Sequence, residues 1–112
     1  MLPDDRERLQ HIANAYASVQ RFISGRGREE LDRDEMLRFA LMRAIEIIGE
    51  AASRISESGR RDLPALPWAQ MIGMRNRLVR AYFSVNHDVL WIAATREVPA
   101  LATAVAAALA VP

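Results

Sequence analysis

Every run of apolar residues that shows a period in this chain repeats at the spacing of an α-helix. No stretch alternates between apolar and polar residues as a β-strand does, and neither Asn-Gly nor Asp-Gly occurs to close a hairpin. The connections between the amphipathic runs are short, which favours an antiparallel up-down arrangement of helices. With 112 residues, the chain is expected to form one all-α domain over residues 1–112, a bundle of four to five helices.

The apolar spacing predicts a first helix over about residues 5–24. A second, longer helix is expected from residue 32 or 34 to residue 58, and a third from about 67 to 82. Asn86 can cap the next helix, and Pro99 is expected to open or kink the last helical piece. The long helix also has a second apolar row beside its core stripe, which predicts a homodimer. The row consists of Met36, Ala40, Ile47 and Ala51.

The net positive charge of the chain is concentrated in residues 60–82. All 15 basic residues are Arg, and the formal net charge is only +1, so the whole chain is not a polycation. Residues 60–82, however, hold five Arg against one Asp, whereas the segments on either side carry more acids than bases. This distribution favours a patch that faces an anion. A solvated helix face with scattered Arg is the alternative.

Several classes of site are not expected. The chain has no Cys, which excludes disulfides and thiolate metal sites and is compatible with a reducing cytoplasm. Two His without a metal-binding spacing argue against a transition-metal site, and no glycine-rich phosphate loop is present, so no metal and no cofactor is expected. The N-terminus is charged, so no signal peptide is expected. The apolar tail over residues 100–111 is shorter than a membrane span, which favours a cytoplasmic protein with no membrane contact.

The segment from Arg75 to Tyr82 gathers three guanidinium groups and a phenol within about two helical turns. Arg75 can bind a phosphate through two parallel N–H bonds, and Arg77 and Arg80 add positive charge. Asn76 can add a directed donor, and the Tyr82 phenol could donate to a phosphate oxygen or be modified itself. The alternative is structural: Arg75 would join helices through a carboxylate, and Tyr82 would be ordinary core.

Only His11 and His87 can change charge near neutral pH. His11 falls on the polar side of the first helix and is expected to be exposed. His87 follows Arg80 by seven residues and would share its face if one helix ran unbroken. The cap signal at Asn86 instead places His87 in the first turn of the next helix, where a surface position is expected.

Two separated motifs resemble those of HepT-like proteins, a branch of the HEPN superfamily. The first is Ala44-Ile-Glu-Ile-Ile-Gly-Glu-Ala-Ala52 in the long helix. The second is Pro67-Trp68 followed by Ile72-Gly-Met-Arg-Asn-Arg-Leu-Val79, and then by Ala81 and Tyr82. Val85, Asn86 and Trp91 fit the same pattern. The motifs agree in order and distance, and the resemblance covers essentially the whole chain.

The resemblance implies an all-α bundle that forms homodimers and acts as the toxin of a toxin–antitoxin pair. The antitoxin would be a small nucleotidyltransferase of the MntA type. The family motif, Arg, four residues, His, one residue, Tyr, is associated with metal-independent RNA cleavage where two protomers meet. The antitoxin is thought to attach AMP to the motif Tyr. By position, the motif Arg is Arg75 and the modifiable Tyr is Tyr82. We expect Asn76, Arg77 and Arg80 to bind the RNA phosphate together with Arg75.

The position of the motif His holds Arg80, which is where the chain departs from the family. Metal-free RNA cleavage needs a proton taken from the 2′-hydroxyl and one given to the leaving 5′-oxygen. A His can do both, whereas Arg stays protonated and cannot act as a base. Losing such a group typically costs a factor of ~10²–10⁴ in rate. Either a natural loss or a deliberate replacement of a toxic His would give this sequence.

Three hypotheses follow. The first is a ribonuclease toxin with impaired or absent cleavage. The second is a non-catalytic module that binds a nucleotidyltransferase and is its AMPylation substrate at Tyr82. The third is a helical interaction protein in which Arg75 and Tyr82 are structural.

Overall fold

The computed structural model describes residues 1–74, 76 and 86–111, and all the regular structure in them is helical. This confirms the all-α fold class. The elements in chain order are α1 (Pro3–Ile23), η1 (Arg28–Asp32), α2 (Glu35–Ser53), α3 (Glu57–Asp62), a helical stretch over residues 68–74, α5 (His87–Ile92), η2 (Ala93–Glu97) and α6 (Val98–Leu109).

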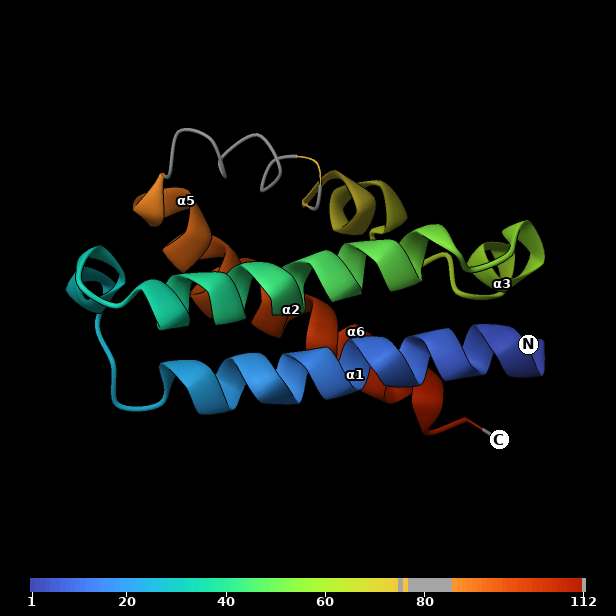
Figure 1. Cartoon of the computed structure of the whole chain (residues 1–112). Coiled ribbons are helices and arrows are strands. Elements are labelled where there is room, and N and C mark those ends of the chain that lie inside the picture. The colour runs from blue at the N-terminus through green and yellow to red at the C-terminus, as the bar shows by residue number, and fades with distance from the viewer. Residues whose placement is uncertain (75, 77–85, 112) are drawn as a thin grey trace.

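The bundle is built on an antiparallel pair of long helices. In Figure 1, α1 and α2 lie side by side and run in opposite directions, while α6 crosses behind them. The apolar stripes of the three helices meet in one core, as their helical period requires. Fully buried members include Leu9, Ile12 and Val19 from α1, Leu41, Ile45 and Ile48 from α2, and Val98 and Val105 from α6.

The first helix ends close to where the sequence predicts. Helix α1 covers Pro3–Ile23, within two residues of the expected bounds. Gly25 then adopts a left-handed φ of 72°, which a residue with a Cβ rarely adopts. The Arg26 N–H donates to the Ile23 carbonyl at 3.0 Å and closes the turn. The chain therefore reverses at once and places η1 at the start of α2.

The second helix starts as expected but ends five residues early. Asp34 caps its start, since its carboxylate accepts from the Leu37 N–H at 3.0 Å. The predicted end at residue 58 is wrong, because α2 stops at Ser53 and a separate helix, α3, begins at Glu57. Ser56 caps α3 by accepting from the Gly59 N–H at 3.0 Å. That cap signal lies inside what the apolar spacing alone presents as one helix.

A buried carboxylate at the start of α1 holds this break in place. Asp5, 3% exposed, accepts from the Ser56 N–H at 2.9 Å and from the Ser56 hydroxyl at 2.6 Å. Burial acts to raise the pKa of Asp5, but these hydrogen bonds and the nearby N-terminal charge outweigh it, so the pKa lies below its ordinary value. A Cβ at Gly59 would come within 2.5 Å of Asp5 Oδ2. We call Asp5, Ser56 and Gly59 the α1–α3 clasp.

The last helices form one continuous helical segment from residue 87 to residue 109. Asn86 caps it by accepting from the Val89 N–H at 3.1 Å, which confirms the predicted cap. Before Pro99 the helix widens into the π-turn η2, where the Val98 N–H donates to the Ala93 carbonyl. Pro99 lacks an N–H and its ring crowds the preceding turn, and a π-turn accommodates both effects. Pro99 thus opens α6 without interrupting the helix.

Among the described residues, this segment is the one helix with the length and apolar composition to cross a membrane, with a mean hydropathy of 1.3. Length and composition are weak grounds, because the core helix of a globular protein meets them as well. Here the segment contributes Leu90, Ala94, Leu101 and Val105 to the core. The expectation of a short tail helix is therefore wrong in length, because residues 100–109 are the end of a helix of 23 residues. Since the segment packs in the core, we interpret it as a core helix.

Candidate functional site

The predicted phosphate-binding segment lies almost wholly outside the described residues. Arg75, Arg77, Arg80 and Tyr82 fall there, and of the predicted site residues only Asn76 is described, as helical and exposed. Their roles stay predictions.

The chain just before this segment is anchored in the core. Met71 and Met74 are buried, with exposed fractions of 0% and 1%. Trp68, at the start of the helical stretch, donates its indole N–H to the Leu63 carbonyl at 3.1 Å. The predicted third helix is therefore confirmed as far as residue 74, and the apolar residues of its first turns face the interior.

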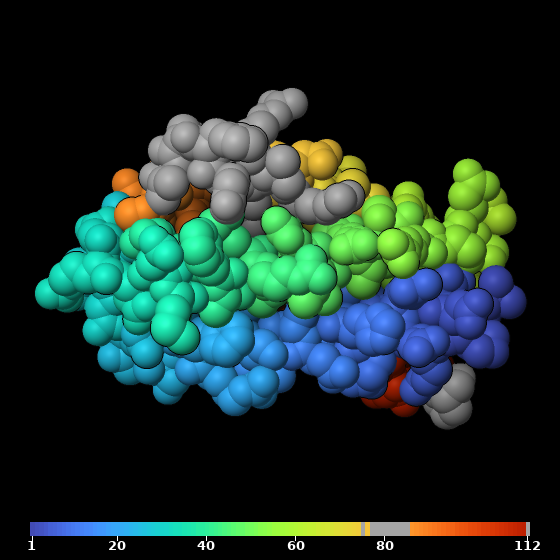
Figure 2. Space-filling view, in the orientation of Figure 1, coloured from blue at the N-terminus to red at the C-terminus, as the bar shows by residue number. Residues whose placement is uncertain are grey.

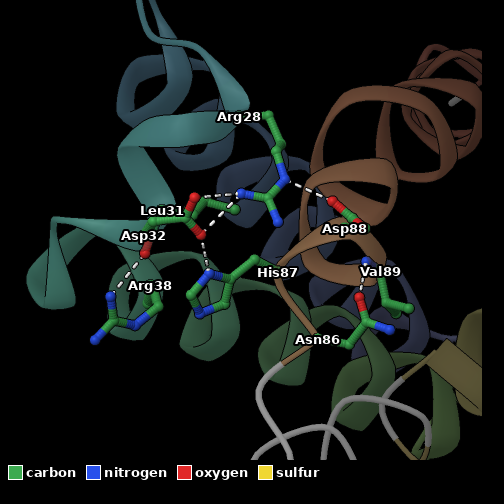
Figure 3. Close-up of polar contacts among 8 residues, drawn as sticks. All are labelled: Arg28, Leu31, Asp32, Arg38, Asn86, His87, Asp88 and Val89. Carbon is green, nitrogen blue, oxygen red and sulfur yellow. Dashed lines mark hydrogen bonds and ion pairs between the residues drawn. The ribbon is translucent and has the colours of Figure 1, made fainter.

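The chain that follows the segment enters α5 in a cluster of charged groups, shown in Figure 3. Four side chains form this cluster, which we call the η1–α5 junction: Arg28 and Asp32 from η1, and His87 and Asp88 from α5. Leu31 is fully buried and holds η1 against the core, and Arg38 of α2 donates to the Leu31 carbonyl at 2.7 Å. The cap at Asn86 places His87 and Asp88 in the first turn of α5, opposite η1.

Arg28 bridges two carboxylates in the junction. Its Nη1 donates to both oxygens of Asp32 at 2.8 Å, and its Nε donates to Asp88 Oδ1 at 2.5 Å. Arg28 and Asp32 are four residues apart in η1, whereas Asp88 comes from α5. The guanidinium therefore fixes the Asp32 carboxylate on one side and joins the two elements on the other.

His87 binds the same carboxylate from the opposite side. Its Nδ1 lies 2.5 Å from Asp32 Oδ1, and the His87 side chain is 18% exposed, so the ring is largely covered. In Figure 3 the other ring nitrogen, Nε2, points away from Asp32. Within the described part of the chain, no residue forms a hydrogen bond with that nitrogen.

Hydrogen bonds from Arg28 and His87 keep Asp32 ionised. The pKa of the Asp32 carboxyl lies below its ordinary value, mainly because Arg28 donates to it and then because His87 does. The pKa of Arg28 is raised in turn by its hydrogen bonds to Asp32 and Asp88.

An imidazole held at Nδ1 by a carboxylate, with Nε2 left open, can take up and release protons near neutral pH. The sequence predicts the position of His87 in the first turn of a helix, but nothing in it predicts the partner. Asp32 lies 55 residues earlier, and the spacing of charges in one chain carries no signal for such a pairing. The only local indication of this site in the sequence is the Arg28–Asp32 pair, because these two residues are four positions apart.

A shallow cavity of about 210 Å³ lies between α1 and α2. These two helices form the front of the space-filling view in Figure 2. The lining of the cavity is mostly apolar and includes Phe22, Ala40 and Ile47. Arg43 at its edge pairs with Glu46 at 3.4 Å, so this cation is already neutralised. Two large apolar side chains of α2, Met36 and Phe39, are 82% and 49% exposed. A neighbouring cavity shares Arg43 and Ile47 and is also lined by Arg8, His11 and Arg54, so the α1–α2 face combines apolar and basic side chains.

Among the described residues, no group of three or more His, Cys, Asp or Glu side chains is placed to hold a metal ion. Polar side chains from distant segments of the described chain meet at the α1–α3 clasp, at the η1–α5 junction and around a cavity lined by Arg8 and His11 of α1 and by Arg43, Glu50 and Arg54 of α2. In the junction the His ring is hydrogen-bonded to a carboxylate from another element.

Comparison with known proteins identifies the family. The model of the family described as "Ribonuclease HepT-like" matches residues 12–108. A "Probable ribonuclease HepT" of Thermococcus cleftensis is 36% identical over 96 residues, which cover 86% of this chain and 87% of that protein. A "Putative RNase" of Methanocaldococcus jannaschii is 35% identical over 91 residues, covering 81% and 84% of the two chains.

A further "Putative RNase", from Caldanaerobacter subterraneus subsp. tengcongensis, is 32% identical over 96 residues, with 86% of each chain covered. No solved structure matches the chain significantly. The matched region and the level of identity are sufficient to assign the family, in agreement with the resemblance seen in the sequence motifs. The chain belongs to the ribonuclease HepT-like family.

Proposed function

We propose that this chain is the toxin-type component of a HepT/MntA pair, and that it binds RNA but cleaves it poorly. One observation carries the proposal: the family match spans the segment in which Arg75 and Tyr82 stand at the motif positions and Arg80 replaces the motif His. The guanidinium groups would bind the phosphodiester, as bidentate donors do. Because Arg80 cannot accept a proton, the motif lacks its acid–base group.

The proposal is tested by restoring the motif. Arg80→His is expected to make expression of the chain arrest growth, while the unchanged chain is tolerated. A matched variant, Arg80→Gln, removes the charge without adding a base and should stay tolerated. If Arg80→His and Arg80→Gln behave alike, the arginine at this position is not what limits cleavage.

A second candidate function rests on the same substitution. A chain that keeps an arginine-rich segment and a tyrosine, but has no base between them, suits a binding partner and AMPylation substrate of an MntA-type nucleotidyltransferase. Incubation with such an enzyme and ATP should add mass in units of AMP, and Tyr82→Phe should abolish the gain. No gain with the unchanged chain would leave the ribonuclease proposal standing alone. The cytoplasm is the proposed compartment for either function.

We also propose that the active form is a homodimer, through the exposed apolar side of α2. The predicted row is only partly exposed, because Ala51 is buried and Ile47 is half-buried, but Met36 and the neighbouring Phe39 extend outward. Covering two such side chains is worth about 1.5–3 kcal/mol each when burial is complete. A monomeric mass by light scattering at micromolar concentration contradicts this assembly.

A further inference from the structure

We propose that His87, positioned by Asp32, is a second proton-transfer group for RNA cleavage and acts in place of the His that position 80 lacks. The inference rests on the proposed ribonuclease function and adds to it a catalytic residue outside the family motif. It concerns only the described residues of the η1–α5 junction. His87 also follows Tyr82 by five residues in the chain, so the ring and the motif belong to adjoining segments.

The choice of His87 follows from elimination and then from geometry. The chain contains two His, and the function needs a group that exchanges protons near neutral pH. His11 has a side chain that is 44% exposed, and its one charged contact is Glu7 on the same helix at 4.0 Å. The His87 side chain is 18% exposed, less than half the exposed fraction of His11, and its Nδ1 lies 2.5 Å from a carboxylate of another element. Only His87 is therefore held in one orientation.

The contacts of the ring also decide its tautomer. An ionised carboxylate can only accept, so Nδ1 of His87 must carry the hydrogen in the contact with Asp32. In the neutral ring Nε2 then has a free lone pair, and it points away from Asp32 (Figure 3). Asp32 cannot turn away from the ring because Arg28 binds both of its oxygens. Among the described residues, the charged side chains drawn with the ring in Figure 3 are Asp32 and Arg28 from η1, Arg38 from α2 and Asp88 from α5.

In the proposed step, Nε2 of His87 accepts the proton of a ribose 2′-hydroxyl. The bond between the 2′-oxygen and phosphorus forms as the bond between phosphorus and the 5′-oxygen breaks. The proton held on Nε2 then passes to the leaving 5′-oxygen, which regenerates the neutral ring. The products are a 2′,3′-cyclic phosphate and a 5′-hydroxyl end. Asp32 stabilises the imidazolium formed in between and acts as a positioning residue, without touching the RNA.

A purely structural latch between η1 and α5 is the competing explanation for the same contacts, and the experiment separates the two. The substrate is an end-labelled single-stranded RNA oligonucleotide of mixed sequence, with EDTA present. The central variant is His87→Asn, because an Asn amide can still donate to Asp32 in place of Nδ1–H but offers no base. It should lower the cleavage rate of the unchanged chain by about 10²-fold and leave RNA retention on a filter unchanged.

Two further variants make the result specific. His11→Asn, the matched control, should cleave as the unchanged chain does. Asp32→Asn should move the midpoint of the rate–pH curve to lower pH, because the imidazolium loses its negative partner. A latch would lower the rate through misfolding without moving that midpoint. Helical circular dichroism at 25 °C, compared between each variant and the unchanged chain, identifies any variant that has lost its fold.

The possible outcomes distinguish a failure of the role of His87 from a failure of the proposed ribonuclease function. If His87→Asn folds and cleaves as fast as the unchanged chain, His87 is not catalytic. If Arg80→His cleaves while the unchanged chain does not, the ribonuclease function stands and the role of His87 is overturned. If neither form cleaves or retains RNA, the proposed function fails and the inference falls with it.

Discussion

Two contacts between distant segments are centred on a carboxylate, the α1–α3 clasp and the η1–α5 junction. They differ in the burial of the carboxylate and in the groups that donate to it. In the clasp, Asp5 is 3% exposed and its donors are the uncharged N–H and hydroxyl of Ser56. In the junction, the Asp32 side chain is 50% exposed and its donors are Arg28 and His87. The pKa of each carboxyl is lowered, for Asp5 by hydrogen bonds from Ser56 that outweigh burial and for Asp32 mainly by hydrogen bonds from Arg28 and His87.

Because of this difference, the two contacts have different roles. The clasp has no unused polar atom that titrates near neutral pH, and a glycine packs against it, so it fixes the end of α2 and nothing more. The junction leaves an imidazole nitrogen open and draws its attraction from exposed charges, which contribute little stability. We therefore assign stability to the clasp and chemistry to the junction.

The largest expected loss of stability comes from removing the buried carboxylate. Asp5→Ala leaves the Ser56 N–H without a partner and should lower the free energy of unfolding by about 2–4 kcal/mol, since hydrogen bonds to charged groups are worth ~1.5–3 each. Asp4→Ala, one residue away and exposed, is the matched control and should change little. Urea unfolding followed by circular dichroism measures both, and equal effects would remove the clasp from the account.

Replacing glycine by alanine should change the stability in opposite directions at two positions, one of them in the clasp. Gly59→Ala adds a Cβ 2.5 Å from Asp5 Oδ2 and 2.9 Å from Ile55 Cγ2, and should destabilise by about 1–3 kcal/mol. The Cβ of Gly73→Ala, in the helical stretch over residues 68–74, meets no atom of the described residues within 4 Å. This substitution should stabilise by up to ~1 kcal/mol. Thermal unfolding of the two variants gives both signs directly.

Acid unfolding sharpens the comparison further. The pKa of Asp5 is lower in the folded state than in the unfolded state. Its contribution to the free energy of unfolding is therefore complete above the unfolded-state pKa, and it is lost as the pH falls through the folded-state pKa. Asp5→Asn should therefore be less stable than the unchanged chain at pH 7, and the gap should narrow as the pH falls below about 4. A gap that stays constant down to pH 2 shows that Asp5 does not act through its charge.

The smallest effect is expected in the junction. Arg28→Met removes the bridge between Asp32 and Asp88 and should destabilise less than Asp5→Ala, because all three side chains are at least one-third exposed. Its effect should fall further in 1 M NaCl, where charges are screened over about 3 Å. A loss as large as that of Asp5→Ala, and independent of salt, would make the junction a structural element and weaken the case for chemistry there.

The sequence predicts those parts of the fold that depend on neighbours in the chain. The bounds of α1, the Asp34 and Asn86 caps and the all-α class follow from apolar spacing and from side chains acting within one turn. The early end of α2 does not, because its cause is Asp5 binding Ser56 across 51 residues. A local signal existed in Ser56 as a cap, but the apolar stripe continues past it.

The same distinction applies to the site. The motif residues Arg75, Arg77, Arg80 and Tyr82 were identified from the sequence and remain predictions, since they lie outside the described residues. The His87–Asp32 contact is visible only in three dimensions, because it joins the first turn of α5 to the last residue of η1. Local patterns thus indicate which chemistry to look for, whereas tertiary packing decides which groups meet.

Arg80, at the position of the family's proton-transfer group, is the residue that limits RNA cleavage in this proposal. The most direct measurement is the rate at which purified Arg80→His and the unchanged chain cleave the same labelled RNA, side by side with EDTA present. We predict faster cleavage by Arg80→His, by up to ~10²–10⁴-fold, with 2′,3′-cyclic phosphate ends. Equal rates for the two proteins would contradict the account.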